Sequence, residues 1–245
     1  MHLVSAWACA NHLVLGQVKT DDKSNEITAI PELLKLLDLC GSIVTVDAMG
    51  TQKEIAEEIR KKEADYVMAL KGNQGLLHDD VKAYWEDPQL PETEYQSFET
   101  VDKGHGRMEI RRYRISDQIE WLQPQAEWQG LRNIGMVESE RIIRGRTTRE
   151  RRYYLSSLKA DAKEFARAIR EHWSIENQLH WSLDVSFRED HCRVWIQKAA
   201  ENFALLRRMA LYILKQDKTQ NRSINRKRWL VAMRPDYLSV LLEGI

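Results

Sequence analysis

The segment from residue 42 to residue 70 restricts the fold of this chain most strongly. Residues 42–47 are apolar and β-branched and predict a buried strand, while residues 52–62 have the charged and apolar spacing of an amphipathic helix. Residues 66–70 predict a second strand. A strand, a helix and another strand at this spacing favour two parallel strands in one sheet. The expected fold class is therefore α/β.

The residues before this segment predict further elements of the same sheet. Residues 2–9 and 12–18 predict a hairpin that leads into the sheet and makes it mixed. A helix is expected to begin at Ser24 or Asn25, with Pro31 dividing it before it ends near residue 39.

The middle of the chain predicts a β-rich insertion. A helix over residues 76–85 is followed by Pro88 and Pro91, which mark a linker. Strand-like runs over 97–115 and 134–155 come next, and the end of the second run returns to the core as a strand. The remaining sequence predicts helices at 163–170, 173–185, 199–215 and 237–242.

Two acidic residues occupy positions at which carboxylates often bind metal ions. Asp47 follows the apolar strand, although a turn or helix-capping aspartate explains its position equally well. Glu176 lies beside the apolar residues Leu179 and Leu183 on a predicted helix, where it could also be the rim of an amphipathic face. Acids at a strand tip and on a distant helix commonly hold divalent ions for phosphoryl transfer. Asp47 and Glu176 are therefore candidate catalytic and metal-binding residues.

The net charge of zero hides an uneven distribution of charge. Residues 1–138 contain 15 Lys or Arg against 24 Asp or Glu, whereas residues 139–245 contain 22 against 13. The basic residues gather in a cluster and in a later run: Arg141, Arg144, Arg146, Arg149, Arg151, Arg152 and Arg226–Arg228. Clustered cations can neutralise phosphates, although a solvated hairpin and helix would explain them too. Beside a carboxylate site, they favour double-stranded DNA as the partner.

Other residues are candidates for contact with DNA. Lys71 and Asn73 lie in a loop after a strand, where they can cradle a phosphate or simply form a turn. Glycines flank His105 and precede Arg107, so the backbone there can approach DNA closely. Trp173, beside the predicted acidic site, can stack on an unpaired base.

The hydropathy and the cysteine content of the chain indicate its cellular compartment. No apolar run approaches the roughly 20 residues that a membrane helix needs. The three cysteines, Cys9, Cys40 and Cys192, are few and scattered, which favours a reducing environment. We therefore expect a cytoplasmic protein with no membrane partner.

Three short motifs carry a family resemblance. They are His-Trp-Ser-Ile-Glu-Asn at 172–177, Val-Asp-Ala-Met-Gly at 46–50 and Leu-Lys-Gly-Asn-Gln at 70–74. These motifs resemble those of insertion-sequence transposases with an Asp-Asp-Glu triad, of the H-repeat-associated type, and the likeness covers nearly the whole chain. It implies an RNase H-like mixed sheet flanked by helices, with a β-rich insertion and a helical C-terminal part.

The resemblance also implies roles for individual residues. Asp47 would be the second acid of the triad and Glu176 the third, with Mg²⁺ or Mn²⁺ as the cofactor. The reaction would be hydrolysis of a DNA phosphodiester and attack of the freed 3′-hydroxyl on target DNA. His172 stands where related transposases often carry an arginine, four residues before the glutamate, and would contact DNA. The family would place a lysine seven residues after the glutamate to assist the acidic residues. That position is Leu183 here, so this chain has no lysine for that role.

The same resemblance suggests the domain organisation. The first part of the catalytic core would span residues 1–75, the β-rich insertion 76–150, the rest of the core 151–190 and the helical part 191–245. The family's first acid lies on a strand before the hairpin, so we expect this chain to begin after that strand and to be inactive in cleavage. A homo-oligomer is compatible with the family.

Two other classes of function remain as alternatives. The chain could be a non-catalytic DNA-binding remnant of a transposase. A different metal nuclease is disfavoured, because Asp184 is the only other acid near Glu176 on the predicted helix.

Overall fold

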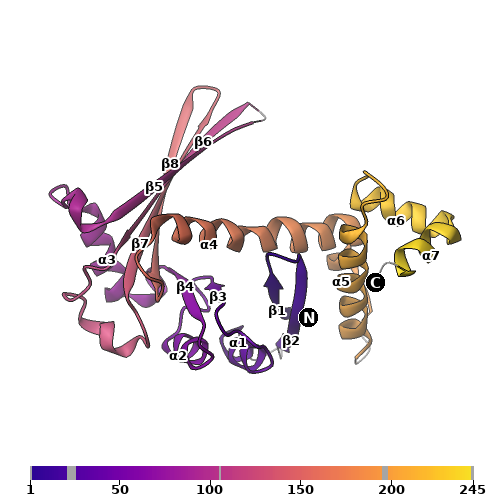
Figure 1. Ribbon diagram of the computed structural model, residues 1–245, viewed down its shortest axis with the longest axis horizontal. Helices are drawn as coiled ribbons and strands as arrows, with labels where there is room; N and C mark the ends of the chain where they lie inside the picture. Colours follow the sequence, from indigo (N-terminus) through magenta and orange to yellow (C-terminus); the bar gives the residue numbers. More distant parts are fainter. Residues whose placement is uncertain (1, 21–25, 105, 195–197, 244–245) are drawn as a thin grey trace. The chain divides into compact units, whose positions relative to one another are not determined.

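A computed structural model describes residues 2–20, 26–104, 106–194 and 198–243 (Figure 1). The chain forms two compact units. Ser24–Arg170 makes the larger one, and Met1–Lys23 together with Glu171–Ile245 makes the smaller one. Each unit packs around apolar clusters of its own.

A six-stranded mixed sheet organises the larger unit, with strand order β3-β4-β8-β7-β6-β5. The strands are β3 (Ile43–Val46), β4 (Asp65–Leu70), β5 (Gln96–Gly104), β6 (Arg107–Ser116), β7 (Asn133–Ile143) and β8 (Arg146–Ser156). β3 and β4 are parallel, and every other pairing in this sheet is antiparallel. The predicted α/β class and the parallel strand pair are confirmed.

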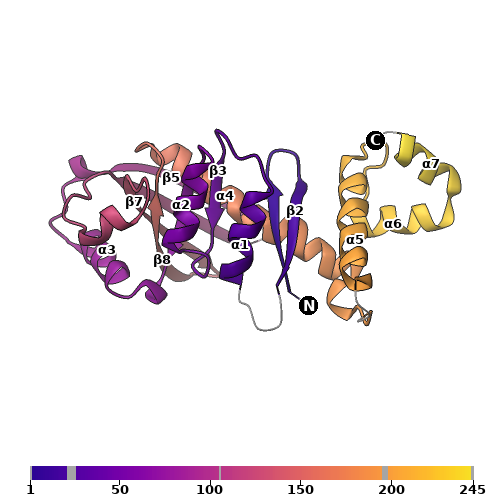
Figure 2. The same ribbon diagram turned by 90° about the horizontal axis from the view of Figure 1, so that it is seen from below.

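Helices cover both faces of this sheet. They are α1 (Glu26–Lys35), α2 (Lys53–Lys61), α3 (Leu76–Glu86) and the first part of α4 (Ala162–Ile175). Alternate residues of a strand point to opposite faces, so Tyr66 and Met68 of β4 join the core under α1, α2 and α3. Val67, between them, packs with Phe165 of α4 on the other face. Figures 1 and 2 show α1 and α2 on the face of β3 and β4 opposite α4.

Two predictions about the first elements need correction. The hairpin of β1 (His2–Ala8) and β2 (Leu13–Thr20) forms a separate two-stranded sheet. The large sheet is mixed instead because β8 pairs antiparallel with β4. Pro31 lies inside α1 without dividing it, and the predicted cap at residues 24 and 25 lies outside the described residues.

The smaller unit is largely helical. After α4 come the π-helical turns η4 (Glu176–His180) and η5 (Ser182–Ser186), then α5 (Ala199–Gln216), α6 (Ile224–Met233) and α7 (Pro235–Glu243). The sequence did not predict α6, whose first turns are polar and basic and lack a regular apolar stripe. Short 3₁₀ turns complete the chain at η1 (Gly72–Gln74), η2 (Glu92–Glu94), η3 (Gln123–Glu127) and η6 (Glu189–His191). None of the described helices is long and apolar enough to cross a membrane.

The packing of β7 against α4 gives a testable prediction. A Cβ atom added at Gly135 would lie 2.2 Å from Cζ of Phe165, which is fully buried. Gly135→Ala should therefore lower the free energy of unfolding by about 1–3 kcal/mol, as overpacked cores do. Urea denaturation measures the loss. Gly104→Ala is the control, because its Cβ would meet no atom within 4 Å; equal losses in the two variants would contradict the packing argument.

Candidate metal and nucleic-acid site

Asp47 stands directly after β3, at the carboxyl end of the strand. Its Oδ1 accepts hydrogen bonds from the backbone N–H groups of Met49 and Gly50, each at 3.1 Å. The residue is exposed, and its Oδ2 has no hydrogen-bond partner in the part of the chain that the structure describes. The two interpretations of the sequence are therefore compatible. One carboxylate oxygen shapes the turn, and the other remains open to a cation.

The turn after Asp47 is tightly packed. A Cβ at Gly50 would lie 2.4 Å from Cγ1 of Val46, so only glycine fits without displacing that side chain. Thr51 is fully buried, and its hydroxyl lies 2.6 Å from the carbonyl oxygen of Ala69 and 2.9 Å from that of Asp47. The turn is thus anchored to the ends of both parallel strands.

The loop after β4 contacts this turn. The side-chain amide of Asn73 donates to the carbonyl oxygen of Ala48 at 2.7 Å, and that of Gln74 donates to the carbonyl oxygen of Thr51 at 2.6 Å. Lys71 and Asn73 are exposed. The structure therefore gives Asn73 a contact within the protein that the sequence did not indicate. Binding of phosphate by Lys71 and Asn73 stays a prediction.

Glu176 lies in the smaller unit, as the first residue of η4. A π-helical turn closes its hydrogen bonds one residue later than an α-helix, so the predicted face shared with His180 and Asp184 does not follow from α-helical spacing. Such turns are frequent at functional sites. The rings of His172 and Trp173 meet edge to face just before this turn, with centroids 6.2 Å apart. The convergence of Glu176 with Asp47 remains a prediction.

The described residues offer limited means of binding a metal. Mg²⁺ prefers oxygen ligands, and the open Oδ2 of Asp47 is a donor of that kind. Within the described ranges, no group of three or more His, Cys, Asp or Glu side chains could hold a metal ion. The side chain of Glu176 lies outside what the structure describes. Asp47 thus fits a divalent ion as a single ligand.

Several arginines of the predicted DNA-binding cluster pair with acids on the sheet. The pairs are Arg141–Glu109 at 2.7 Å, Arg149–Glu140 at 3.1 Å, Arg151–Glu138 at 2.8 Å and Arg152–Glu150 at 2.7 Å. The side chains of Glu109, Glu138 and Glu140 are only 10%, 15% and 12% exposed. These arginines largely neutralise acids of the sheet, which reduces the charge they can offer to a phosphate.

Arginines at the tip of the β7–β8 hairpin differ from those along its length. Arg144 and Arg146 form no ion pair with any residue that the structure describes. Arg144 and Gly145 both have positive φ, at 49° and 77°, which is the pattern of a two-residue hairpin turn of type I′. The turn therefore holds both guanidinium groups at the end of the hairpin.

The β5–β6 hairpin ends beside this tip. The strand register pairs Gly104 with Arg107, Arg107 with Ile143, and Ile143 with Arg146, so these positions form one row across four strands. Arg107 lies 4.0 Å from Glu109. We call Arg107, Arg144 and Arg146 the cationic tip. His105, predicted to contact DNA here, lies outside the described residues.

The second basic run, Arg226–Arg228, is not a continuous cationic surface. Lys227 is buried, and its Nζ donates to the carbonyl oxygen of Leu214 and pairs with Oδ2 of Asp217, each at 3.0 Å. The hydroxyl of Tyr237 donates to Asp217 at 2.6 Å. Lys227 therefore adds no exposed charge to this run, because its amine neutralises a buried carboxylate. Binding of DNA by the run stays a prediction.

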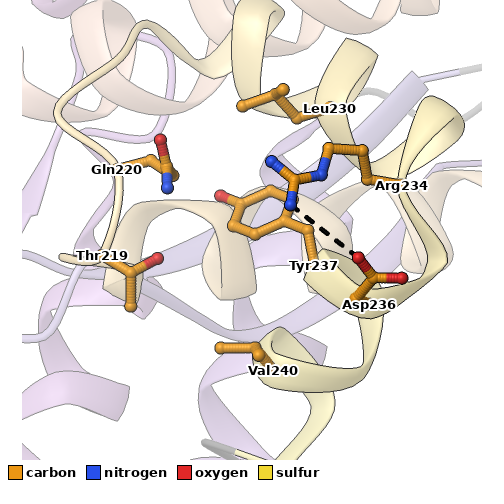
Figure 3. Close-up of a pocket in the computed structure, with 7 residues that line it drawn as sticks. All are labelled: Thr219, Gln220, Leu230, Arg234, Asp236, Tyr237 and Val240. Atoms are coloured by element: carbon orange, nitrogen blue, oxygen red, sulfur yellow. Dashed lines mark ion pairs between the residues drawn. The ribbon is translucent and has the colours of Figure 1, made fainter.

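This network also sets two pKa values. Burial opposes ionisation of Asp217, yet hydrogen bonds from Thr219, Tyr237 and Lys227 hold the pKa of its carboxyl well below the usual range. Burial and Asp217 raise the pKa of Tyr237 to about 12. Figure 3 shows the adjoining pocket, of about 250 Å³. It is lined by Thr219, Gln220, Leu230, Arg234, Asp236, Tyr237 and Val240.

The paired acids of the sheet predict a pH dependence. Burial opposes ionisation of Glu109, but Arg141 and Arg111 outweigh it and lower the pKa of the carboxyl. The ionised Glu109 carboxylate therefore stabilises the folded state fully above the ordinary glutamate pKa of about 4.3. This stabilisation is lost as the pH falls through the lower pKa that Glu109 has in the folded state. The thermal unfolding midpoint should fall more steeply below about pH 5 in the wild type than in Glu109→Gln. Parallel pH profiles would contradict this assignment.

Comparison with known proteins agrees with the family resemblance of the sequence motifs. Residues 1–214 match the family model of the transposase DDE domain. Over its whole length the chain is 43% identical to the "H repeat-associated putative transposase YhhI" of Escherichia coli strain K12. It is 44% identical, also over its whole length, to "Putative protein YbfL" of the same strain.

The match extends over only part of each relative. The chain spans 66% of the length of both of these curated proteins. Within that span, the motif around Asp47 lies on a well-packed strand tip, and the motif around Glu176 lies on a helical segment. The predicted resemblance is confirmed: this chain belongs to the transposase DDE domain family.

Proposed function

We propose that this chain is part of an insertion-sequence transposase that cleaves and joins DNA with a divalent metal ion. The observation that carries the proposal is the tip of β3. There, an exposed carboxylate binds its own turn through Oδ1 and leaves Oδ2 open. The membership of the chain in the DDE family supports the assignment of that carboxylate to the catalytic site.

An RNase H-like core is part of this proposal. The parallel strands β3 and β4 would belong to it, and β5, β6 and β7 would come from the β-rich insertion. β3 is an edge strand of its sheet. In such a core, the strand with the first acid would pair beside β3, and none of the described strands occupies that place.

Asp47 and Glu176 would share the binding of the metal. A divalent ion supplies positive charge that activates the attacking oxygen and stabilises the leaving one. Asp47 would bind through Oδ2 while Oδ1 keeps its two backbone hydrogen bonds, so the carboxylate retains its direction. A cytoplasmic location belongs to the same proposal, because that is where bacterial chromosomal DNA lies.

Local oxidative cleavage can test whether Asp47 and Glu176 hold the same ion. Fe²⁺ that replaces Mg²⁺ generates radicals with ascorbate and peroxide, and these cut the nearest backbone. We expect fragments from cuts near residue 47 and near residue 176, both suppressed by excess Mg²⁺. Mass spectrometry of the fragments locates the cuts.

Two variants complete this experiment. Asp47→Asn and Glu176→Gln should each reduce cutting at both positions, because each removes a charged ligand of the shared site. Cutting near one residue alone, or cutting that the variants leave unchanged, would reject the shared site.

The proposed DNA partner is supported by the cationic tip. Arg144 and Arg146 have no acidic partner among the described residues, whereas Arg149, farther along β8, is paired with Glu140. A two-stranded β-ribbon fits the major groove of B-DNA, and arginine can form forked contacts with phosphates. The β7–β8 hairpin could therefore bring its tip against duplex DNA. The contribution of Arg149 is expected to be smaller.

Binding of duplex DNA by single variants tests the tip. Arg146→Ala should weaken DNA binding about threefold to tenfold at low salt. It should also reduce the slope of the logarithm of the binding constant against the logarithm of the salt concentration by about 1, as loss of one phosphate contact does. Arg149→Ala is the matched control, because it removes the same charge from the same strand. Fluorescence titrations at several salt concentrations measure both. Equal effects of the two substitutions would contradict a special role for the tip.

A non-catalytic DNA-binding protein is the second candidate. It is favoured by Arg144 and Arg146, which form no ion pair with any described residue and could bind DNA without a metal ion. It predicts DNA binding that depends on the cationic tip, together with no Fe²⁺-dependent cutting near residues 47 and 176. The two experiments above therefore separate the candidates.

A further inference from the structure

The two hydrogen bonds that hold the Asp47 carboxylate come from consecutive peptide groups. The N–H of Met49 belongs to the same peptide group as the carbonyl of Ala48. The carbonyl oxygen of Ala48 accepts the amide of Asn73 at 2.7 Å, and the N–H of Met49 donates to Oδ1 of Asp47 at 3.1 Å. One peptide group therefore connects the side chains of Asn73 and Asp47.

We propose that Asn73 is a positioning residue for Asp47, acting through the Ala48–Met49 peptide group. A trans peptide is planar, with its C=O and N–H pointing in opposite directions. When Asn73 fixes the direction of the carbonyl, it also fixes the direction of the N–H that holds Oδ1. Hydrogen bonds linked in series through such a group also strengthen one another. The inference rests on the proposed role of Asp47 as a metal ligand.

The parallel strand pair makes this contact available. Val46 of β3 is in register with Met68 of β4, so the loops that follow the two strands begin at the same edge of the sheet. Gly72, Asn73 and Gln74 form the 3₁₀ turn η1, and Gly75 then takes a positive φ of 48° before α3 begins. This geometry directs the Asn73 amide back to Ala48, which is itself only 8% exposed.

Gln74 provides a matched comparison within the same loop. Its amide donates to the carbonyl oxygen of Thr51 at 2.6 Å, a hydrogen bond as short as that of Asn73. The peptide group of that carbonyl does not donate to Asp47. Loss of either hydrogen bond would loosen the contact between loop and turn. Loss of the Asn73 bond also weakens the hold on a peptide group that binds the carboxylate, because the Ala48 carbonyl then keeps a longer hydrogen bond, at 3.4 Å, from the backbone N–H of Thr51.

The test compares Asn73→Leu with Gln74→Leu in the full chain. Each substitution removes one amide donor and keeps a side chain of comparable size. Mn²⁺ alone is the probe, and its affinity is measured by the paramagnetic signal of free Mn²⁺. Asn73→Leu should weaken Mn²⁺ binding about threefold to tenfold, in line with the loss of one hydrogen bond. Gln74→Leu should weaken it less than twofold. Equal effects, or no effect of Asn73→Leu, would overturn the inference.

A second measurement separates this inference from the proposed function. Hydrogen exchange of the Met49 amide should accelerate more in Asn73→Leu than in Gln74→Leu, whether or not metal binds. Equal exchange in the two variants would reject the role of Asn73. Asp47→Asn should abolish most Mn²⁺ binding, and unchanged binding in that variant would instead reject Asp47 as a ligand. Leu76→Ala, in the exposed start of α3, controls for nonspecific changes near the loop.

Discussion

The antiparallel pairing of β4 with β8 is the contact on which the larger unit depends. Beside this pairing, the fully buried Ser157 donates its backbone N–H to the carbonyl oxygen of Tyr66 at 3.1 Å. Its hydroxyl accepts the N–H of Tyr66 at 2.9 Å and donates to Asp65 at 2.8 Å. On one side of this junction lie the parallel strands that present Asp47. On the other side lie the long hairpins with the cationic tip. A single sheet therefore carries both parts of the proposed function that lie in this unit.

Ion pairing decides which charges of that sheet can act on a partner. Glu109, Glu138 and Glu140 are mostly removed from solvent, and a buried carboxylate without a partner is strongly unfavourable. Arginines on neighbouring strands neutralise these acids and so stabilise the hairpins. At the tip, Arg107 still lies near Glu109, whereas Arg144 and Arg146 form no ion pair with any described residue. Among the described residues, arginines along β8 are thus paired with acids, whereas Arg144 and Arg146 at the turn are not.

The strand tips show how a single carboxylate can be directed by neighbours distant in sequence. Asp47 and Asn73 are separated by a helix and a strand, but the parallel pairing of β3 and β4 brings their loops to one edge. Close packing at Gly50 and the buried Thr51 restrict the turn further. The direction of Oδ2 is then a property of several peptide groups rather than of the aspartate alone.

Local pattern was sufficient to predict the strands and most helices, the parallel pair and the candidate residue Asp47, because hydrophobic period and turn residues act over short distances. Motif likeness identified the family. Only the tertiary structure separated the β1–β2 hairpin from the large sheet, paired Arg149 with Glu140, buried Lys227 against Asp217 and brought Asn73 to Ala48. These outcomes depend on which distant strands and helices become neighbours. The local sequence around a charged or amide side chain is the same whether that side chain contacts solvent, a phosphate or another residue of the chain.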